Sequence, residues 1–195
     1  MTPFRILRTL SLALILALAG SASGFAQKVP LAEPNKAPET LKVTLDVKGG
    51  KVPMESVFNG FGCTGGNQSI GISWTGVPKE AKSIAILMHD PDAPTGVGFF
   101  HWSVVDLPAD TKGLAKGASP KSLPPGAIEG YTDFGSHGYG GPCPPPGKPH
   151  RYIFTVYAVK EAKLGVDASA TGALLRFMLN GNSLALGRAT ATFGR

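Results

Sequence analysis

Several familiar signatures of function are missing from this 195-residue sequence. The formal net charge is +6, but there is no run of Lys or Arg, so nucleic-acid binding has little support. The His-Glu-x-x-His spacing of zinc hydrolases is absent, and the nearest approach to a Gly-x-Ser-x-Gly nucleophile turn, FGSHG (134–138), lacks the first glycine. There is no internal repeat, and only the N-terminal region has a long apolar run.

The N-terminal residues are typical of a secretory signal peptide. Arg5 and Arg8 precede the apolar stretch 10–20, and Gly24 and Ala26 fit a cleavage site before residue 27. The alternative is an uncleaved anchor, although the apolar stretch is short for a membrane span. We therefore expect residues 1–26 to be a signal peptide and the protein to be periplasmic or secreted, with no transmembrane segment in the mature chain.

Removal of 26 residues that include two arginines and no acids would leave 169 residues with a net charge of +4. The next segment, 27–40, is rich in proline and polar residues and is typical of a flexible leader. The rest, 41–195, has the length of one domain with a substantial core.

Cysteine is scarce, with only Cys63 and Cys143 in the chain. In an exported protein a single disulfide is the simplest interpretation of two cysteines. Such a bond would close a loop of about 80 residues and add roughly 4 kcal/mol to stability in the chain-entropy model. The alternative is a reactive Cys143 thiolate paired with His150, which oxidising conditions disfavour.

The pattern of apolar residues predicts a mainly β fold. Several segments are apolar on both faces, as central strands covered on both sides are, and glycine and proline separate them. The expected strands are 41–47, 71–74, 83–89, 101–107, 150–159 and 182–194. One helix is expected near 169–180, with Leu174, Leu175, Met178 and Leu179 on one face, a cap at Ser169 or Thr171, and Gly181 as its end.

Polar residues gather at the ends of these strands. Asp90 and Asp92 flank a proline that stiffens the backbone, and we interpret Asp90 as a site residue and Asp92 as a turn cap. His101 and His150 each stand at the head of an apolar strand. If those two strands lie side by side and start at the same edge, both imidazoles come together.

The segment GYGGPCPPPGKPH (138–150) is too rich in proline to pair as a strand and is expected to form a rigid loop. Its glycines could bring backbone N–H groups close to an anion. Together with two imidazoles and Tyr152, the loop predicts a small cup suited to phosphate or carboxylate.

DPDAP (90–94), the pair HW (101–102) and GYGGPCPPPGKPHRYIFTVYAV (138–159) resemble the phosphatidylethanolamine-binding protein (PEBP) family, in particular its bacterial Raf-kinase-inhibitor-like branch. GGNQSIGISWTGVP (65–78) and the segment 164–195 fit the same branch, so the resemblance covers 41–195. It implies a central β-sheet packed against a smaller sheet, with a few peripheral helices and a cavity that binds phosphate or phospholipid head groups. The implied ligand-binding residues are Asp90, His101, His150 and Tyr152, and less specifically Pro94, Gly140, Gly141 and Pro144.

Members of this family are generally binding or regulatory proteins, so no cofactor or metal is implied and an enzyme is the less favoured interpretation. We expect a small anionic ligand, held by partly protonated His101 and His150, with affinity falling as pH rises. Two alternatives stay open. One is a hydrolase in which the Asp and His residues activate water or hold Zn²⁺. The other is a regulator that recognises a phosphorylated or carboxylate group on a protein partner.

Overall fold

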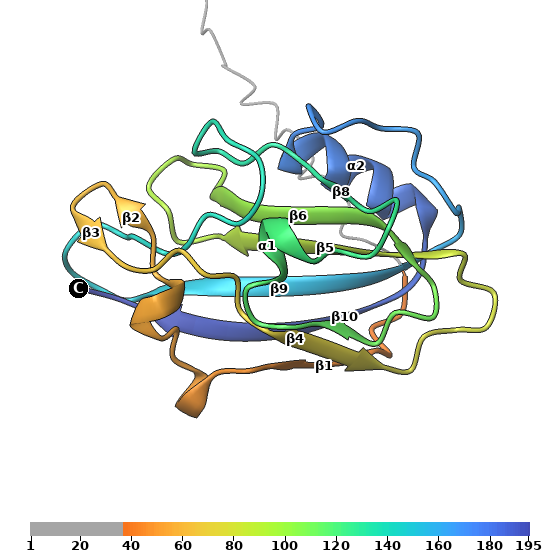
Figure 1. Ribbon diagram of the computed structural model, residues 1–195, viewed down its shortest axis with the longest axis horizontal. Coiled ribbons are helices and arrows are strands. Elements are labelled where there is room, and N and C mark those ends of the chain that lie inside the picture. The colour runs from red at the N-terminus through yellow and green to blue at the C-terminus, as the bar shows by residue number, and fades with distance from the viewer. Residues whose placement is uncertain (1–36) are drawn as a thin grey trace, which may run out of the picture. The chain divides into compact units, whose positions relative to one another are not determined.

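The computed structural model describes residues 37–195, and these form a mainly β fold (Figure 1). The expected signal peptide, 1–26, and most of the expected leader, 27–40, lie outside the described residues. Among the described residues, no helix is both long and apolar enough to cross a membrane.

The largest sheet has five antiparallel strands, in the order β10-β9-β5-β6-β8. Four of its strands confirm the predicted segments 83–89, 101–107, 150–159 and 182–194, with small differences at the ends. The bounds are β5 (Ser83–Asp90), β6 (Phe99–Pro108), β8 (Ile128–Glu129), β9 (His150–Val159) and β10 (Ser183–Phe193).

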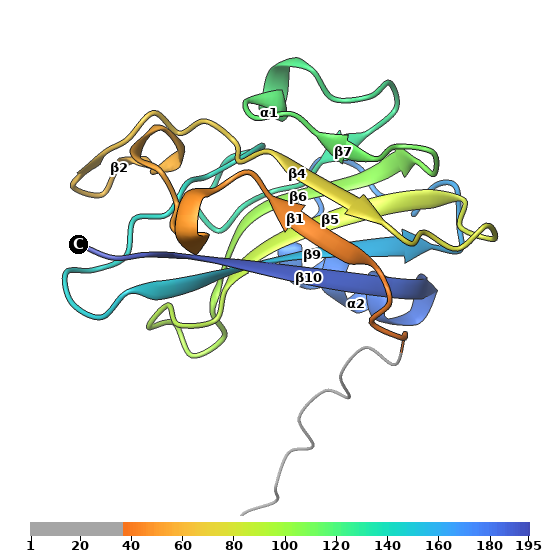
Figure 2. The same cartoon turned by 90° about the horizontal axis from the view of Figure 1, so that it is seen from below.

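A smaller sheet, in the order β1-β4-β7, covers one face of the large sheet, and helix α2 lies on the other face (Figure 2). Its strands are β1 (Lys42–Leu45), β4 (Ile72–Thr75) and β7 (Gly113–Leu114). The remaining short elements are η1 (Lys48–Gly50), η2 (Met54–Ser56), the hairpin β2 (Asn59–Gly60) and β3 (Cys63–Thr64), and α1 (Ala118–Lys121).

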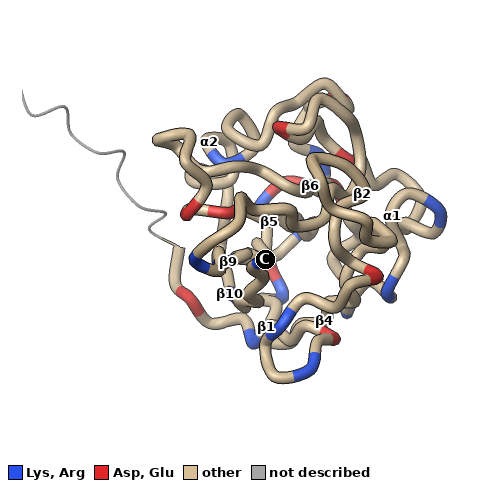
Figure 3. The backbone as a smooth tube through the Cα atoms, turned by 90° about the vertical axis from the view of Figure 1, so that its left-hand side faces the viewer, with Lys and Arg blue, Asp and Glu red and all other residues tan. Residues whose placement is uncertain are grey.

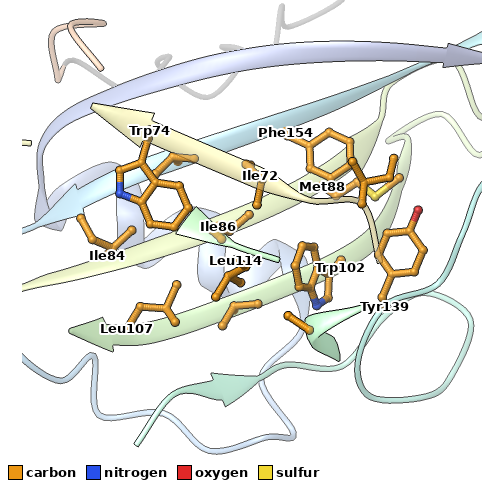
Figure 4. Packing of buried hydrophobic residues seen from close by; sticks show 14 of the residues in the cluster. Ile72, Trp74, Ile84, Ile86, Met88, Trp102, Leu107, Leu114, Tyr139 and Phe154 are labelled. Atoms are coloured by element: carbon orange, nitrogen blue, oxygen red, sulfur yellow. The ribbon is translucent and has the colours of Figure 1, made fainter. Parts of the chain in front are cut away.

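Strand β5 is buried along its whole length because it has a layer on each side. Successive side chains of a strand point to opposite faces. Ile84, Ile86 and Met88 therefore join the core beneath the small sheet, while Ala85 and Leu87 pack in the core beneath α2. Figure 4 shows the first of these cores, with Trp74 of β4 beside Ile84 and Ile86. Burial of each large side chain contributes about 1.5–3 kcal/mol.

Helix α2 (Gly172–Asn182) forms where the spacing of leucines predicts it, and the Thr171 side chain caps it by accepting a hydrogen bond from the Leu174 amide. Two details of the prediction are wrong. Leu174 is 46% exposed, because the buried side of the helix passes through Leu175 and Leu179. Gly181 does not end the helix, which continues to Asn182.

Strand β6 departs from regular pairing with β5 at two places. Phe100 and Trp102 pair with the consecutive residues His89 and Met88, so His101 is an extra residue in β6. A second register shift places an extra residue at Asp106, whose φ is 60°. Bulges of this kind redirect a side chain and are frequent beside binding sites. The first one matters here because it places His101.

Candidate functional site

The candidate site lies where β5 ends and both β6 and β9 begin. Strand β5 is antiparallel to both of its neighbours, so the end of β5 at Asp90 lies beside the starts of β6 and β9. The strands of His101 and His150 are not direct neighbours, because β5 lies between them. The strands that carry the two histidines still begin at one edge of the sheet, and β5 contributes Asp90 between them.

Asp90 and His150 form a close pair at this edge. The His150 Nδ1 atom lies 2.7 Å from Oδ2 of Asp90, and the two side chains are 12% and 4% exposed. Oδ1 of Asp90 accepts a hydrogen bond from the Asp92 amide at 2.8 Å. Both carboxylate oxygens are therefore in use, and the Nε2 atom of His150 is left for a ligand.

His101 is buried, and its Nδ1 atom lies 2.8 Å from the Gly140 carbonyl oxygen. A carbonyl can only accept, so Nδ1 carries the proton that is donated. Burial lowers the pKa of His101 to about 4, although the Gly140 carbonyl and Asp90 act in the opposite direction. The ring is therefore neutral near pH 7, which contradicts the expectation that His101 is partly protonated.

Tyr152 follows His150 by two residues in β9, so both side chains project on the same side of the strand. The Tyr152 ring meets the His101 ring edge-on, with the ring centroids 5.1 Å apart. The residue is fully buried, yet its hydroxyl has no hydrogen-bond partner among the described residues. Burial raises the pKa of Tyr152 far above its ordinary value, and nearby Asp90 adds to the effect. The hydroxyl therefore keeps its proton. It lies near the Asp90 carboxylate without making a hydrogen bond of normal geometry to it.

These four side chains line a cavity of about 190 Å³, which we call the strand-end cavity. Pro94 and Pro144 line it as well. The complete lining is Phe61, Asp90, Ala93, Pro94, Thr95, Phe99, His101, Phe134, Cys143, Pro144, Pro145, His150 and Tyr152. Of these residues, none is Lys or Arg.

Gly140 and Gly141 are the exceptions among the predicted residues, because neither lines the cavity. The Gly140 amide donates to the His101 carbonyl at 2.8 Å, and the Gly141 amide donates to the Asn67 side-chain oxygen at 2.7 Å. Their N–H groups are thus not available to an anion. Gly141 instead allows close packing, since a Cβ there would lie 2.2 Å from the Ser56 carbonyl oxygen.

The proline-rich loop forms one wall of the cavity and is attached at several points. Cys143 is bonded to Cys63 in β3, with the sulfur atoms 2.11 Å apart, so the alternative of a free Cys143 thiolate is not supported. The Arg195 side chain donates to the Pro144 carbonyl at 2.7 Å. Rigidity of the loop thus comes from cross-links as well as from its prolines.

Asp92 caps a backbone N–H group, as the favoured interpretation predicted, but the group belongs to Arg151 in β9 rather than to its own turn. Its carboxylate accepts hydrogen bonds from the Arg151 backbone amide and from the Arg151 guanidinium, at 2.7–2.9 Å. The guanidinium lowers the pKa of Asp92 well below its ordinary range. The pair is largely exposed and joins the loop after β5 to the start of β9.

Sequence reasoning missed the aromatic residues of the site. Phe61, Phe99 and Phe134 all line the cavity, although they come from three separate segments. Three signals were available from their positions in the chain. Phe61 lies two residues before Cys63, Phe99 lies two residues before His101, and Phe134 begins the segment FGSHG.

Charge is not concentrated at this end of the structure. Figure 3 shows this end of the fold, with basic and acidic positions interspersed around it rather than gathered into a patch. In residues 37–195 no group of three or more His, Cys, Asp or Glu side chains is placed to hold a metal ion. The acidic and basic side chains that line the cavity are Asp90, His101 and His150.

The fold and the cavity together define a β protein with a small, partly polar pocket at the ends of its central strands. The sequence profile described as phosphatidylethanolamine-binding protein matches residues 46–194. The chain therefore belongs to the phosphatidylethanolamine-binding protein family.

Individual relatives agree with this assignment. The UPF0098 proteins YbcL and YbhB of Escherichia coli are each 46% identical to the chain, over 74% of its length and over 81% and 93% of theirs. The crystal structure of E. coli YbcL, described as a new member of the mammalian PEBP family, matches with a TM-score of 0.77 at 44% identity. It covers 80% of this chain and 99% of YbcL. A PEBP homologue from Chlamydia trachomatis matches with a TM-score of 0.68 at 29% identity, over 80% of this chain and 99% of its own.

Proposed function

We propose that this protein binds a small phosphate-like anion in the strand-end cavity. The observation that carries the proposal is the buried Tyr152 hydroxyl, which has no partner among the described residues and lines the cavity. A buried donor without an acceptor is costly, and an anion in the cavity would supply the acceptor. Free phosphate and the phosphate of a lipid head group share this chemistry.

His150 supplies the second contact in the proposal. When protonated, it donates from Nδ1 to Asp90 and from Nε2 to the ligand, and the Asp90–His150 pair is neutral overall. When neutral, it still donates its one proton to Asp90 and has none left for an anion. Neutral His101 supplies no positive charge to a ligand.

Export to an oxidising compartment forms part of the same proposal. The Cys63–Cys143 bond supports it, because such bonds persist outside the cytoplasm. Fractionation of cells that produce the full-length chain, with mass determination of the N-terminus, tests both the location and cleavage before residue 27.

Binding is tested by calorimetric titration of inorganic phosphate and of phosphoethanolamine at one fixed pH. We expect both to bind the wild type, and we expect His150→Gln to weaken both, because it removes the imidazole Nε2 contact. Tighter binding of phosphoethanolamine would identify the head group as the better source of the anion. Unchanged affinity for both probes in His150→Gln would contradict the role of His150.

A further inference from the structure

Phe61 stands at an unfavourable position in the backbone. It and Gly62 are the two residues between strands β2 and β3, and their φ angles are 51° and 81°. Two-residue hairpin turns with positive φ at both positions are normally filled by Asn-Gly or Asp-Gly. A bulky residue in the left-handed region is uncommon and costs free energy. The requirements of the turn alone therefore do not explain a phenylalanine here.

The hairpin that carries Phe61 is fixed against the cavity wall. The Arg195 guanidinium donates to the carbonyls of Phe61 and Gly62 at 3.2 and 3.1 Å, as well as to Pro144. Cys63 is bonded to Cys143 in the same wall. Backbone strain that is held in this way by its surroundings is typical of ligand clamps.

Phe61, Phe99 and Phe134 form what we call the aromatic rim. The Phe61 and Phe134 ring centroids are 5.6 Å apart, and Phe99 meets Phe134 edge-on at 4.7 Å. Phe61 is 70% exposed, so much of its ring surface is free. The rim lines the same cavity as Tyr152 and His150. Flat aromatic groups pack well in offset or edge-on contacts with such rings.

The electrostatics of the cavity limit what a bare anion can gain. Asp90 and the partly buried His150 of its lining form an ion pair only when His150 is protonated, and no Lys or Arg is among the lining residues. The Asp90–His150 pair has no net positive charge even when His150 is protonated, so it would not attract a dianion such as free phosphate. Contacts with the apolar rim must therefore supply much of the affinity. A volume of about 190 Å³ gives room for a small group next to these residues.

We infer that the strand-end cavity is specific for an acid group attached to an aromatic ring, with aryl phosphates as the simplest case and Phe61 as the specificity-determining residue. The acid group would contact Tyr152 and His150, and its ring would pack against Phe61. This inference rests on the proposed function, because the acid group occupies the proposed anion site.

Three phosphate monoesters test the inference by calorimetry with the full-length protein. Phenyl phosphate, cyclohexyl phosphate and methyl phosphate carry the same acid group on a flat ring, a puckered ring and a methyl group. We expect phenyl phosphate to bind at least tenfold more tightly than methyl phosphate, with cyclohexyl phosphate between them. Equal affinity for phenyl and cyclohexyl phosphate would contradict selectivity for an aromatic ring.

Two variants assign the effect to Phe61. Phe61→Asn installs a residue that the turn prefers, so we expect thermal stability to be unchanged or raised while the advantage of phenyl over methyl phosphate disappears. Phe177→Ala is the control, since Phe177 is 77% exposed on α2 and does not line the cavity. A phenyl advantage that persists in Phe61→Asn would overturn the role of Phe61.

A third variant separates failure of this inference from failure of the proposed function. If all three esters bind equally and Tyr152→Phe weakens each of them, the anion site stands and the aromatic specificity is wrong. If no ester binds, or if Tyr152→Phe has no effect on any of them, the proposed function is wrong and the inference fails with it.

Discussion

At the scale of single residues, the buried hydroxyl of Tyr152 makes the clearest prediction. Tyr152→Phe removes a donor that has no partner among the described residues, so we expect the free energy of unfolding to stay the same or rise. Anion affinity should fall by roughly 10- to 100-fold, because hydrogen bonds to charged groups contribute about 1.5–3 kcal/mol. Urea unfolding and calorimetric titration measure the two effects.

Tyr139→Phe provides the matched control. Tyr139 is also buried, but its hydroxyl donates to the Ser56 carbonyl at 3.0 Å and it does not line the cavity. Loss of this bond should lower stability by about 1 kcal/mol and leave anion affinity unchanged. If Tyr152→Phe behaved like Tyr139→Phe, the hydroxyl of Tyr152 would have a structural role only.

His101 predicts how stability depends on pH. Its pKa of about 4 in the folded protein lies below the unfolded value of about 6.5. Between these values the unfolded state binds more protons, so stability decreases as pH falls from about 6.5 to about 4, by up to about 3 kcal/mol. His101→Gln should reduce this slope while retaining a donor for the Gly140 carbonyl. Urea unfolding at several pH values between about 4 and about 6.5 measures how the free energy of unfolding depends on pH.

A complete loss of the slope is not expected, because burial also lowers the pKa of His89. His137→Gln, at an exposed position, is the control and should leave the slope unchanged. Identical slopes in wild type and His101→Gln would show that His101 is not held neutral in the folded protein.

The polar residues of the site could be predicted from sequence, whereas their exact arrangement could not. Asp90, His101, His150 and Tyr152 stand at the ends of strands with obvious apolar patterns, which placed them at one edge. The bulge that positions His101 depends on the register between β5 and β6, and a single sequence carries no record of that register. The hydrogen bonds that occupy the Gly140 and Gly141 amides depend on distant segments in the same way.

At the scale of elements, the disulfide joins the hairpin β2–β3 to the proline-rich loop. Replacement of both Cys63 and Cys143 by Ala should lower the free energy of unfolding by about 2–4 kcal/mol, because the bond closes a loop with a sequence separation of 80. Urea unfolding with and without a reductant measures this. Reductant should destabilise the wild type and have no effect on the double variant. Destabilisation of both would show that the reductant acts elsewhere.

Helix α2 offers a test of backbone conformation. Gly181 lies inside the helix, and a Cβ there would meet no atom within 4 Å, so Gly181→Ala should stabilise the fold by about 0.5–1 kcal/mol. Gly96→Ala is the control, since that position also has free space but a φ of +81°, and it should destabilise by about 1 kcal/mol. Thermal unfolding checks both. Destabilisation by Gly181→Ala would contradict a helical conformation at this residue.

Long elements were predictable because their apolar patterns are long. Strands β5 and β9 and helix α2 each extend over eight or more residues, and the patterns located them within a few residues. Strands β2, β3, β7 and β8 have two residues each, too few for any periodicity. Those short elements nevertheless matter to the site, since β2 and β3 carry the hairpin of Phe61.

At the scale of the whole molecule, two layers on the central sheet leave one edge where the strand ends can form a cavity. The small sheet and α2 bury both faces of β5, which fixes Asp90 at the end of a rigid strand. The proline-rich loop and the hairpin then form the walls. This arrangement suits binding because it keeps the polar groups in place before a ligand arrives.

A crystal structure of the protein soaked in methyl phosphate at mildly acidic pH tests the central claim most directly. We predict electron density for the phosphate group inside the strand-end cavity, within hydrogen-bonding distance of Tyr152 Oη and His150 Nε2. A cavity that stays empty at a saturating concentration, or a phosphate bound only elsewhere on the protein, would contradict the proposed function.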